Sequence, residues 1–130
     1  MSEAQPGSPQ SMLIGVVGPC GSGKSTLVNG LKQRGWRAKN IAQEHSYVPH
    51  MWQRLVHPDL LVFLDVSHAN SMKRRNFDWS PAEHAEQLRR LQHARQHADL
   101  YLDTNVLTIE GVLDAVLVCL NQINSPTGNR

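Results

Sequence analysis

A glycine-rich segment near the N-terminus has the residue types and the spacing of a phosphate-binding loop. The pattern G-x-x-x-x-G-K-[ST] is matched by eight consecutive residues, Gly18-Pro19-Cys20-Gly21-Ser22-Gly23-Lys24-Ser25. Such a loop wraps phosphates with backbone N–H groups, and its glycines leave no Cβ in the way. We expect Lys24 to reach the β- and γ-phosphates and the Ser25 hydroxyl to bind Mg²⁺. With Thr26, these residues form the candidate nucleotide-binding segment; a turn that binds nothing is the alternative.

Short apolar runs and helical stripes alternate along the chain around this motif. Strands are predicted over 12–17, 36–42, 60–66 and 99–102. Helices are predicted after the loop as far as Gly35, and over 51–56, 67–75, 80–98 and 108–122. The 80–98 helix has an apolar stripe of Ala85, Leu88, Leu91, Ala94 and Ala98, and the last helix has one of Ile109, Val112, Leu113, Val116, Leu117 and Leu120.

This alternation predicts the fold class. Strands that are apolar on both faces and alternate with helices indicate a mostly parallel sheet covered on both sides, a three-layer α/β/α sandwich of four or five strands. We expect one domain over 12–124, with tails at 1–11 and 125–130. Binding sites in such sheets lie at the carboxyl ends of the strands, which here are residues 18–25, 43–47, 65–75 and 103–107.

Two carboxylates at these strand ends are candidate metal ligands beside Ser25. If the second strand lies beside the first, Glu44 points toward the γ-phosphate, where it can hold Mg²⁺ through water or act as a general base. Asp65 follows four apolar residues and is the competing candidate. A solvated loop carboxylate is the alternative for Glu44, and a structural role is the alternative for Asp65.

Basic residues cluster after the third strand. Arg74 and Arg75 follow Lys73, and planar guanidinium groups suit the oxygens of a transferring phosphoryl group. A solvated basic helix face is the alternative. Among the basic residues of the next helix, Arg95 is the strongest candidate for a similar role.

Two further groups of residues carry weaker signals. Tyr47, His50, Trp52 and Arg54 lie where an acceptor would bind, but packing of Trp52 in the core is the favoured interpretation. His93 and His97 share a helix face without a third ligand beside them, so we expect no metal there.

Three segments of the chain resemble the P-loop kinases of small molecules, the nucleotide and nucleoside kinase group, with thymidylate-kinase-like proteins nearest. They are the loop itself, residues 58–66 with the basic Lys73-Arg74-Arg75, and Leu102-Asp103-Thr104 with the final helix. The resemblance implies the fold of P-loop nucleoside triphosphate hydrolases and kinases, ATP and Mg²⁺ as cofactors, and lid arginines at Arg74 or Arg75. The chain departs from these kinases between Gln43 and Asp59, where it has no Asp-Arg pair and no long acceptor domain.

Composition excludes several classes of protein. The chain has 130 residues, of which 40% are hydrophobic and 18% charged, and its net charge of +2 is too small to favour nucleic acid or a membrane surface as a partner. No run approaches the ~20 apolar residues of a membrane span, and the basic region of a secretory signal is missing. The two cysteines lie in unlike contexts, so no disulfide framework is expected and a cytoplasmic protein fits best.

The sequence therefore predicts an ATP-binding, Mg²⁺-dependent phosphotransferase acting on a small molecule, with Lys24, Glu44, Arg74 and Arg75 as catalytic residues. The first alternative is a nucleotide-binding switch or slow NTPase without a small-molecule acceptor. The second is a module that binds a partner protein through residues 47–57 and 73–79.

Overall fold

The computed structural model describes residues 12–75 and 78–123. Its order of elements is β1 (Leu13–Val17), α1 (Lys24–Gln33), β2 (Arg37–Asn40), the 3₁₀ helix η2 (Gln43–His45), α2 (Met51–Leu55), β3 (Leu60–Asp65), α3 (His68–Arg75), α4 (Pro81–Arg90), α5 (Gln92–His97), β4 (Leu100–Asp103) and α6 (Ile109–Ile123). The predicted tails, 1–11 and 125–130, lie outside the described residues, as do 76 and 77 of the basic segment 73–79.

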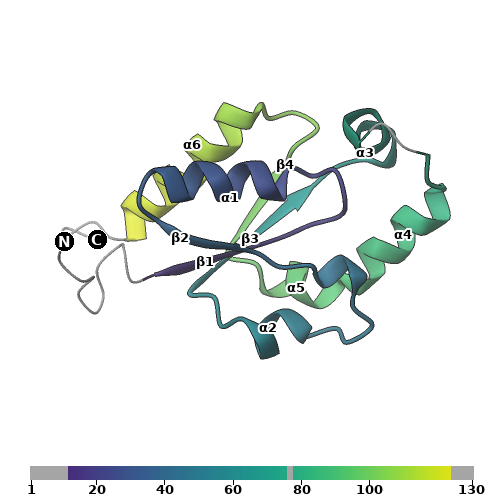
Figure 1. Ribbon diagram of the computed structural model, residues 1–130, viewed down its shortest axis with the longest axis horizontal. Helices are drawn as coiled ribbons and strands as arrows, with labels where there is room; N and C mark the ends of the chain where they lie inside the picture. The colour runs from purple at the N-terminus through teal and green to yellow at the C-terminus, as the bar shows by residue number, and fades with distance from the viewer. Residues whose placement is uncertain (1–11, 76–77, 124–130) are drawn as a thin grey trace.

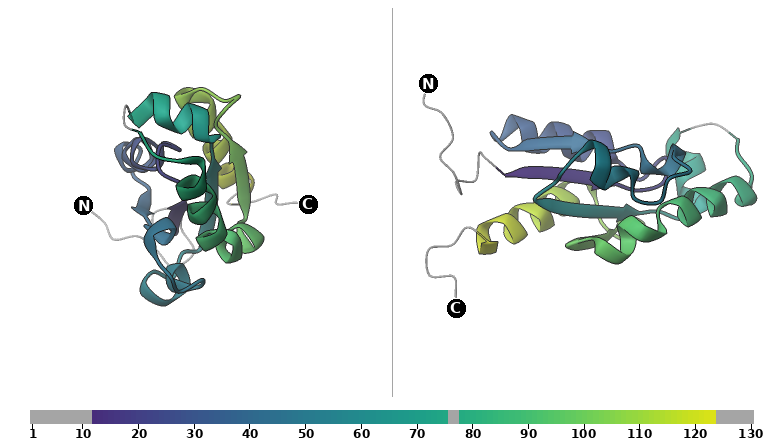
Figure 2. Two further views of the ribbon diagram at one scale, coloured as in Figure 1. Left: turned by 90° about the vertical axis from the view of Figure 1, so that its right-hand side faces the viewer. Right: turned by 90° about the horizontal axis from the view of Figure 1, so that it is seen from below.

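The four described strands form one parallel sheet in the order β2-β1-β3-β4. Figure 1 shows α1 and α6 on one face of the sheet, and α2, α4 and α5 on the other. The views of Figure 2 also show helices on both sides of the strands. The predicted α/β architecture with a parallel sheet is therefore confirmed, and β1, which precedes the loop, is a central strand.

The core follows from the alternation of side chains along the strands. In β3, Leu60, Val62 and Leu64 pack into the cluster beneath α1 and α6, while Leu61 and Phe63 pack into the cluster on the opposite face. Both faces of β3 are therefore buried, which explains its unbroken apolar run.

Two predicted apolar stripes need correction. The predicted helix over 80–98 is divided at Leu91 into α4 and α5, and α4 turns His84 and Gln87 inward while Ala85 and Leu88 are exposed. Ile109, placed in the stripe of the last helix, is also exposed, whereas Val112, Val116 and Leu120 are buried. The Gln87 amide bonds to Cys20, whereas Nδ1 of the buried His84 ring has no hydrogen-bond partner among the described residues.

Within the described residues, no helix combines the length and the apolar character needed to cross a bilayer.

Candidate functional site

The glycine-rich segment forms a tight loop between β1 and α1, and neighbouring backbone shapes it. A Cβ on Gly18 would lie 2.2 Å from the Leu64 carbonyl oxygen, so β3 presses directly against the start of the loop. Gly21 and Gly23 have φ angles of +83° and +97°, which favour glycine. The Ser22 amide donates to the Pro19 carbonyl at 3.2 Å and closes the turn. The chain therefore leaves β1, turns within a few residues and enters α1.

The N-terminus of α1 faces the loop without a side-chain cap. Gly23 is its N-cap residue, and its first turn contains no acidic residue. The first N–H groups of a helix have no acceptor within the helix, and they form the positive end of its dipole. This end of α1 therefore suits an anion.

Lys24 is nearly buried and belongs to a defined set of contacts. Its ammonium group donates to the carbonyl oxygens of Gly18 at 2.7 Å and of Pro19 at 3.2 Å, and it lies 2.9 Å from the Glu44 carboxylate. Glu44 is 4% exposed and Lys24 is 8% exposed, so the ion pair is shielded from water. The structure thus holds the cation of the motif over the loop through a carboxylate supplied by the segment after β2.

The position of Glu44 depends on the residue before it. Gln43 is fully buried, and its amide nitrogen donates to the carbonyls of Val48 and Arg90 while its oxygen accepts from the Trp52 amide. These bonds fix η2 against α4 and α2. Because β2 lies beside β1, the segment after β2 also lies beside the loop, as the prediction for Glu44 required.

A cavity of about 840 Å³ opens beside the loop, and we call it the loop cavity. Its walls are residues 20–27, the end of β2 at Asn40 with Ala42, Glu44 and His45, then Arg74 and Arg75 of α3, and Thr104 with residues 107–109 and Val112. This volume lies within the usual range of ligand pockets, roughly 300–1,000 Å³. Ten of the predicted site residues meet in this one cavity: Cys20, Gly21, Ser22, Gly23, Lys24, Ser25, Thr26, Glu44, Arg74 and Arg75.

Arg74 joins α3 to two other walls of the cavity. Its guanidinium group donates to the Gly21 carbonyl at 3.0 Å, to the Thr104 hydroxyl at 2.9 Å and to the Thr104 carbonyl at 2.6 Å. Arg74 therefore connects the tip of the loop to the segment after β4.

Neither family models nor curated proteins gave a match to this chain. The chemistry of the loop cavity is therefore inferred from its own residues.

Other predicted residues lie away from the loop cavity. The Asp65 carboxylate accepts hydrogen bonds from the Val66 amide and the Tyr101 hydroxyl, and it does not line the cavity. Burial, together with the bond to Asp65, raises the pKa of Tyr101 to about 12. The Arg95 guanidinium lies 4.8 Å from the centre of the Tyr101 ring. The geometry thus joins Asp65 and Arg95 through Tyr101 at the β4 edge.

The aromatic and histidine candidates also have structural partners. Trp52 is 5% exposed, and its indole N–H donates to His93 at 3.1 Å, which confirms that it packs in the core. The rings of His93 and His97 stack at 4.2 Å. Desolvation, followed by the charges of His97 and His50, lowers the pKa of His93. Tyr47 is exposed, with the Arg90 guanidinium 4.3 Å from its ring centre.

Several contacts at the site were absent from the sequence prediction. The Asn40 amide donates to the Ser25 hydroxyl at 3.1 Å, and Gln87 bonds to both the amide and the sulfur of Cys20. Asn40 ends a strand that lies beside β1, and this position is the signal by which sequence analysis could have found it. Gln87 lies between two apolar positions of its helix, so periodicity gave no reason to single it out.

Proposed function

We propose that this chain has the P-loop fold of nucleoside triphosphate hydrolases and kinases, binds ATP at residues 18–26, and transfers its γ-phosphoryl group to a small molecule. The observation that carries the proposal is the buried contact between Lys24 and Glu44 beside an uncapped helix N-terminus. A cation held at that point by a carboxylate and two carbonyls is available to phosphate oxygens that enter the cavity.

The oxygen donors of the cavity fit a magnesium ion. Ser25 and Glu44 both line it, and hard oxygen ligands are those that Mg²⁺ prefers. When bound there with ATP, the ion would neutralise charge on the phosphate oxygens. Asp65 lies outside the cavity, so we assign the magnesium role to Ser25, with Glu44 holding the ion through water.

The remaining roles follow from where each side chain lies. The loop amides and the first turn of α1 bind and orient the phosphates. Lys24 moves from the loop carbonyls to the β- and γ-phosphates, which frees the Glu44 carboxylate to accept the proton of an acceptor hydroxyl. The acceptor oxygen then bonds to the γ-phosphorus as the bond to the β,γ-bridging oxygen breaks, and ADP leaves. Arg74, which already contacts Gly21, supplies positive charge near the transferred group.

A second function is favoured by the short segment between β2 and β3. Its α-helix, α2, packs Trp52 into the core instead of building a separate acceptor lobe. A nucleotide-dependent switch, which binds ATP and hydrolyses it slowly, needs no such lobe. We therefore retain this switch as the alternative.

The test follows the γ-phosphate of labelled ATP with Mg²⁺ and a pool of nucleosides, nucleotides, sugars and small acids. Lys24→Ala is compared with Lys32→Ala, which changes an exposed lysine on the same helix. Label on an organic acceptor, lost in Lys24→Ala and kept in Lys32→Ala, supports the kinase. Label released only as inorganic phosphate supports the switch. Failure of the wild-type chain to bind ATP in equilibrium dialysis would overturn both.

A further inference from the structure

Three side chains with different metal-binding chemistry meet at the edge of the loop cavity. Cys20 comes from the loop, and Glu44 and His45 come from η2. One ligand atom from each, a sulfur, a carboxylate oxygen and an imidazole nitrogen, lies within 4.8 Å of the other two. The loop and η2 are distant in sequence, and the pairing of β2 with β1 brings them together.

The separations of these atoms approach those of a tetrahedral site. The Cys20 sulfur lies 3.6 Å from Nε2 of His45, and that nitrogen lies 3.7 Å from Oε2 of Glu44. Zinc binds sulfur at about 2.3 Å and nitrogen at about 2.0–2.1 Å, so a tetrahedral angle of about 109° places these two ligands about 3.5 Å apart. The sulfur and the nitrogen therefore already stand close to the separation that one zinc ion requires.

The Glu44 carboxylate supplies an independent indication of a cation. One of its oxygens pairs with Lys24, whereas Oε1 is buried and has no hydrogen-bond partner among the described residues. The side chain as a whole is 4% exposed. A buried carboxylate oxygen without a partner is costly, and a metal ion bound beside it would remove that cost.

A neighbouring residue orients the sulfur. The Gln87 side chain accepts from the Cys20 amide at 3.0 Å and donates toward the Cys20 sulfur at 3.4 Å. Contacts of this kind fix the direction of a metal ligand. Gln87 belongs to α4, so the sulfur is fixed from an element outside the loop.

We propose that Cys20, Glu44 and His45 form a site for a zinc-class divalent cation, with a fourth position open to the loop cavity. Thiolate and imidazole ligands select zinc over magnesium, so this site differs from the Ser25 site in its metal and in its Cys20 and His45 ligands, and the two sites share Glu44. Binding forms metal bonds to sulfur, nitrogen and oxygen and releases the thiol proton to solvent. The inference does not depend on the proposed kinase activity, because it concerns the metal alone.

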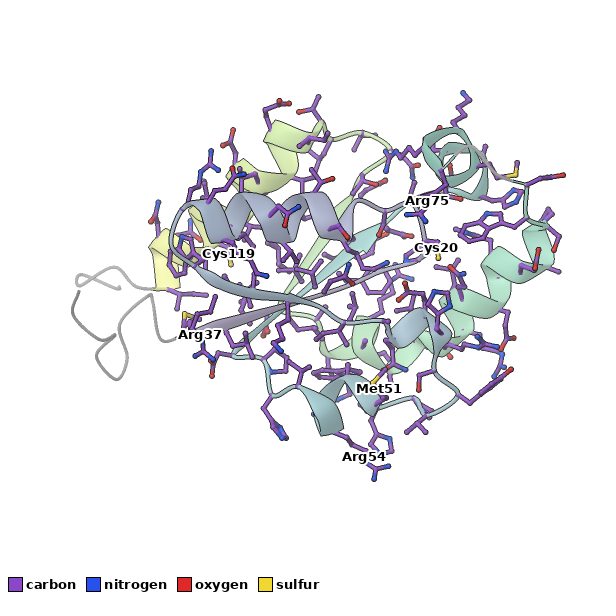
Figure 3. All side chains as sticks on the ribbon, in the orientation of Figure 1. Cys20, Arg37, Met51, Arg54, Arg75 and Cys119 are labelled. Carbon is purple, nitrogen blue, oxygen red and sulfur yellow. The ribbon has the colours of Figure 1, made fainter. Side chains whose placement is uncertain are left out.

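The experiment uses Co²⁺ as an optical probe of the full chain, with the thiols kept reduced by a phosphine. A cobalt–thiolate bond gives a charge-transfer band in the near ultraviolet, and tetrahedral cobalt gives visible bands. The test variants are Cys20→Ser and His45→Ala, and the matched controls are Cys119→Ser and His57→Ala. Figure 3 shows Cys119 at the opposite end of the molecule from Cys20, and His57 is an exposed histidine outside the cluster.

We expect one equivalent of Co²⁺ to give both sets of bands in the wild type and both controls, and one equivalent of Zn²⁺ to remove them. Cys20→Ser should lose the charge-transfer band, and His45→Ala should weaken cobalt binding by at least ~10–100-fold. The His45 side chain is 59% exposed, so His45→Ala keeps the test valid if Cys20→Ser fails to fold. A wild type without the charge-transfer band, a band that persists in Cys20→Ser, or unchanged affinity in His45→Ala would overturn the proposal.

Discussion

The buried pair of Lys24 and Glu44 makes a quantitative prediction about stability. Glu44→Gln keeps the shape of the side chain and removes its charge, so Lys24 stays buried with neutral oxygens as its only partners. Lys24→Met leaves the Glu44 carboxylate buried without its ammonium partner. Each single variant therefore strands one charge, whereas the double variant strands none.

The magnitudes follow from this difference. Removal of one partner of a buried ion pair costs about 3–5 kcal/mol of the free energy of unfolding. We expect about 3 kcal/mol for Glu44→Gln, because the two carbonyls still solvate Lys24, and about 4 kcal/mol for Lys24→Met. The double variant leaves no buried charge and only an amide without its ammonium partner, so it should lose about 1–3 kcal/mol, less than the sum of the two single variants.

The assay is urea unfolding without nucleotide, followed by tryptophan fluorescence. With a slope of about 1–3 kcal/mol per molar urea, the single variants should lower the midpoint by roughly 1–4 M. Glu110→Gln, an exposed carboxylate on α6, is the control and should change stability by less than about 1 kcal/mol. A double variant that loses the sum of the two single effects would show that the charges are not coupled and would refute the reasoning.

Three further perturbations test separate features. Gly21→Ala should lower the free energy of unfolding, measured by thermal unfolding, by about 1–3 kcal/mol, and by more than Gly35→Ala does. Both residues have a positive φ, but only a Cβ on Gly21 would meet the Ser71 backbone, at 2.9 Å. Burial lowers the pKa of His84, so the unfolded chain binds more protons and the free energy of unfolding should fall as the pH drops below 6.5. His84→Gln should flatten this pH dependence, and an unchanged slope in the variant would contradict the prediction. Tyr101 should titrate with a pKa of about 12 in an alkaline absorbance titration, and its contribution to stability should be lost as the pH rises from 10 to about 12. Tyr101→Phe should remove this loss of stability between pH 10 and about 12.

Features encoded by neighbouring residues were predicted best. The loop glycines, the strand before them and the helix after them depend on local spacing, and the structure has β1 and α1 there. Ser80 and Glu83, three positions apart at the start of α4, form a capping box with both hydrogen bonds present. The strand β3 was also predicted, because an apolar run of that length is typical of a strand buried on both faces.

Features that depend on distant partners were missed. The inward direction of Gln87 depends on a contact with Cys20, 67 residues earlier, and apolar periodicity carries no information about it. Arg74 was predicted as a phosphate ligand from its charge, but its bonds to Thr104 require the fold. Asp65 ends an apolar strand as a metal ligand would, yet the pairing of β3 with β4 brings it a tyrosine.

The parallel arrangement of the sheet has a practical consequence for handling the protein. All four strands point their carboxyl ends toward the loop cavity, while β1 begins at Leu13 and α6 ends at Ile123 at the opposite end of the molecule in Figure 1. The right-hand view of Figure 2 shows the same placement. A fluorophore, surface linker or fusion partner joined near either of these residues would be anchored away from the cavity. Immobilised binding assays can therefore use either attachment. Equal affinities measured with the two attachments would indicate that neither attachment disturbs binding at the cavity.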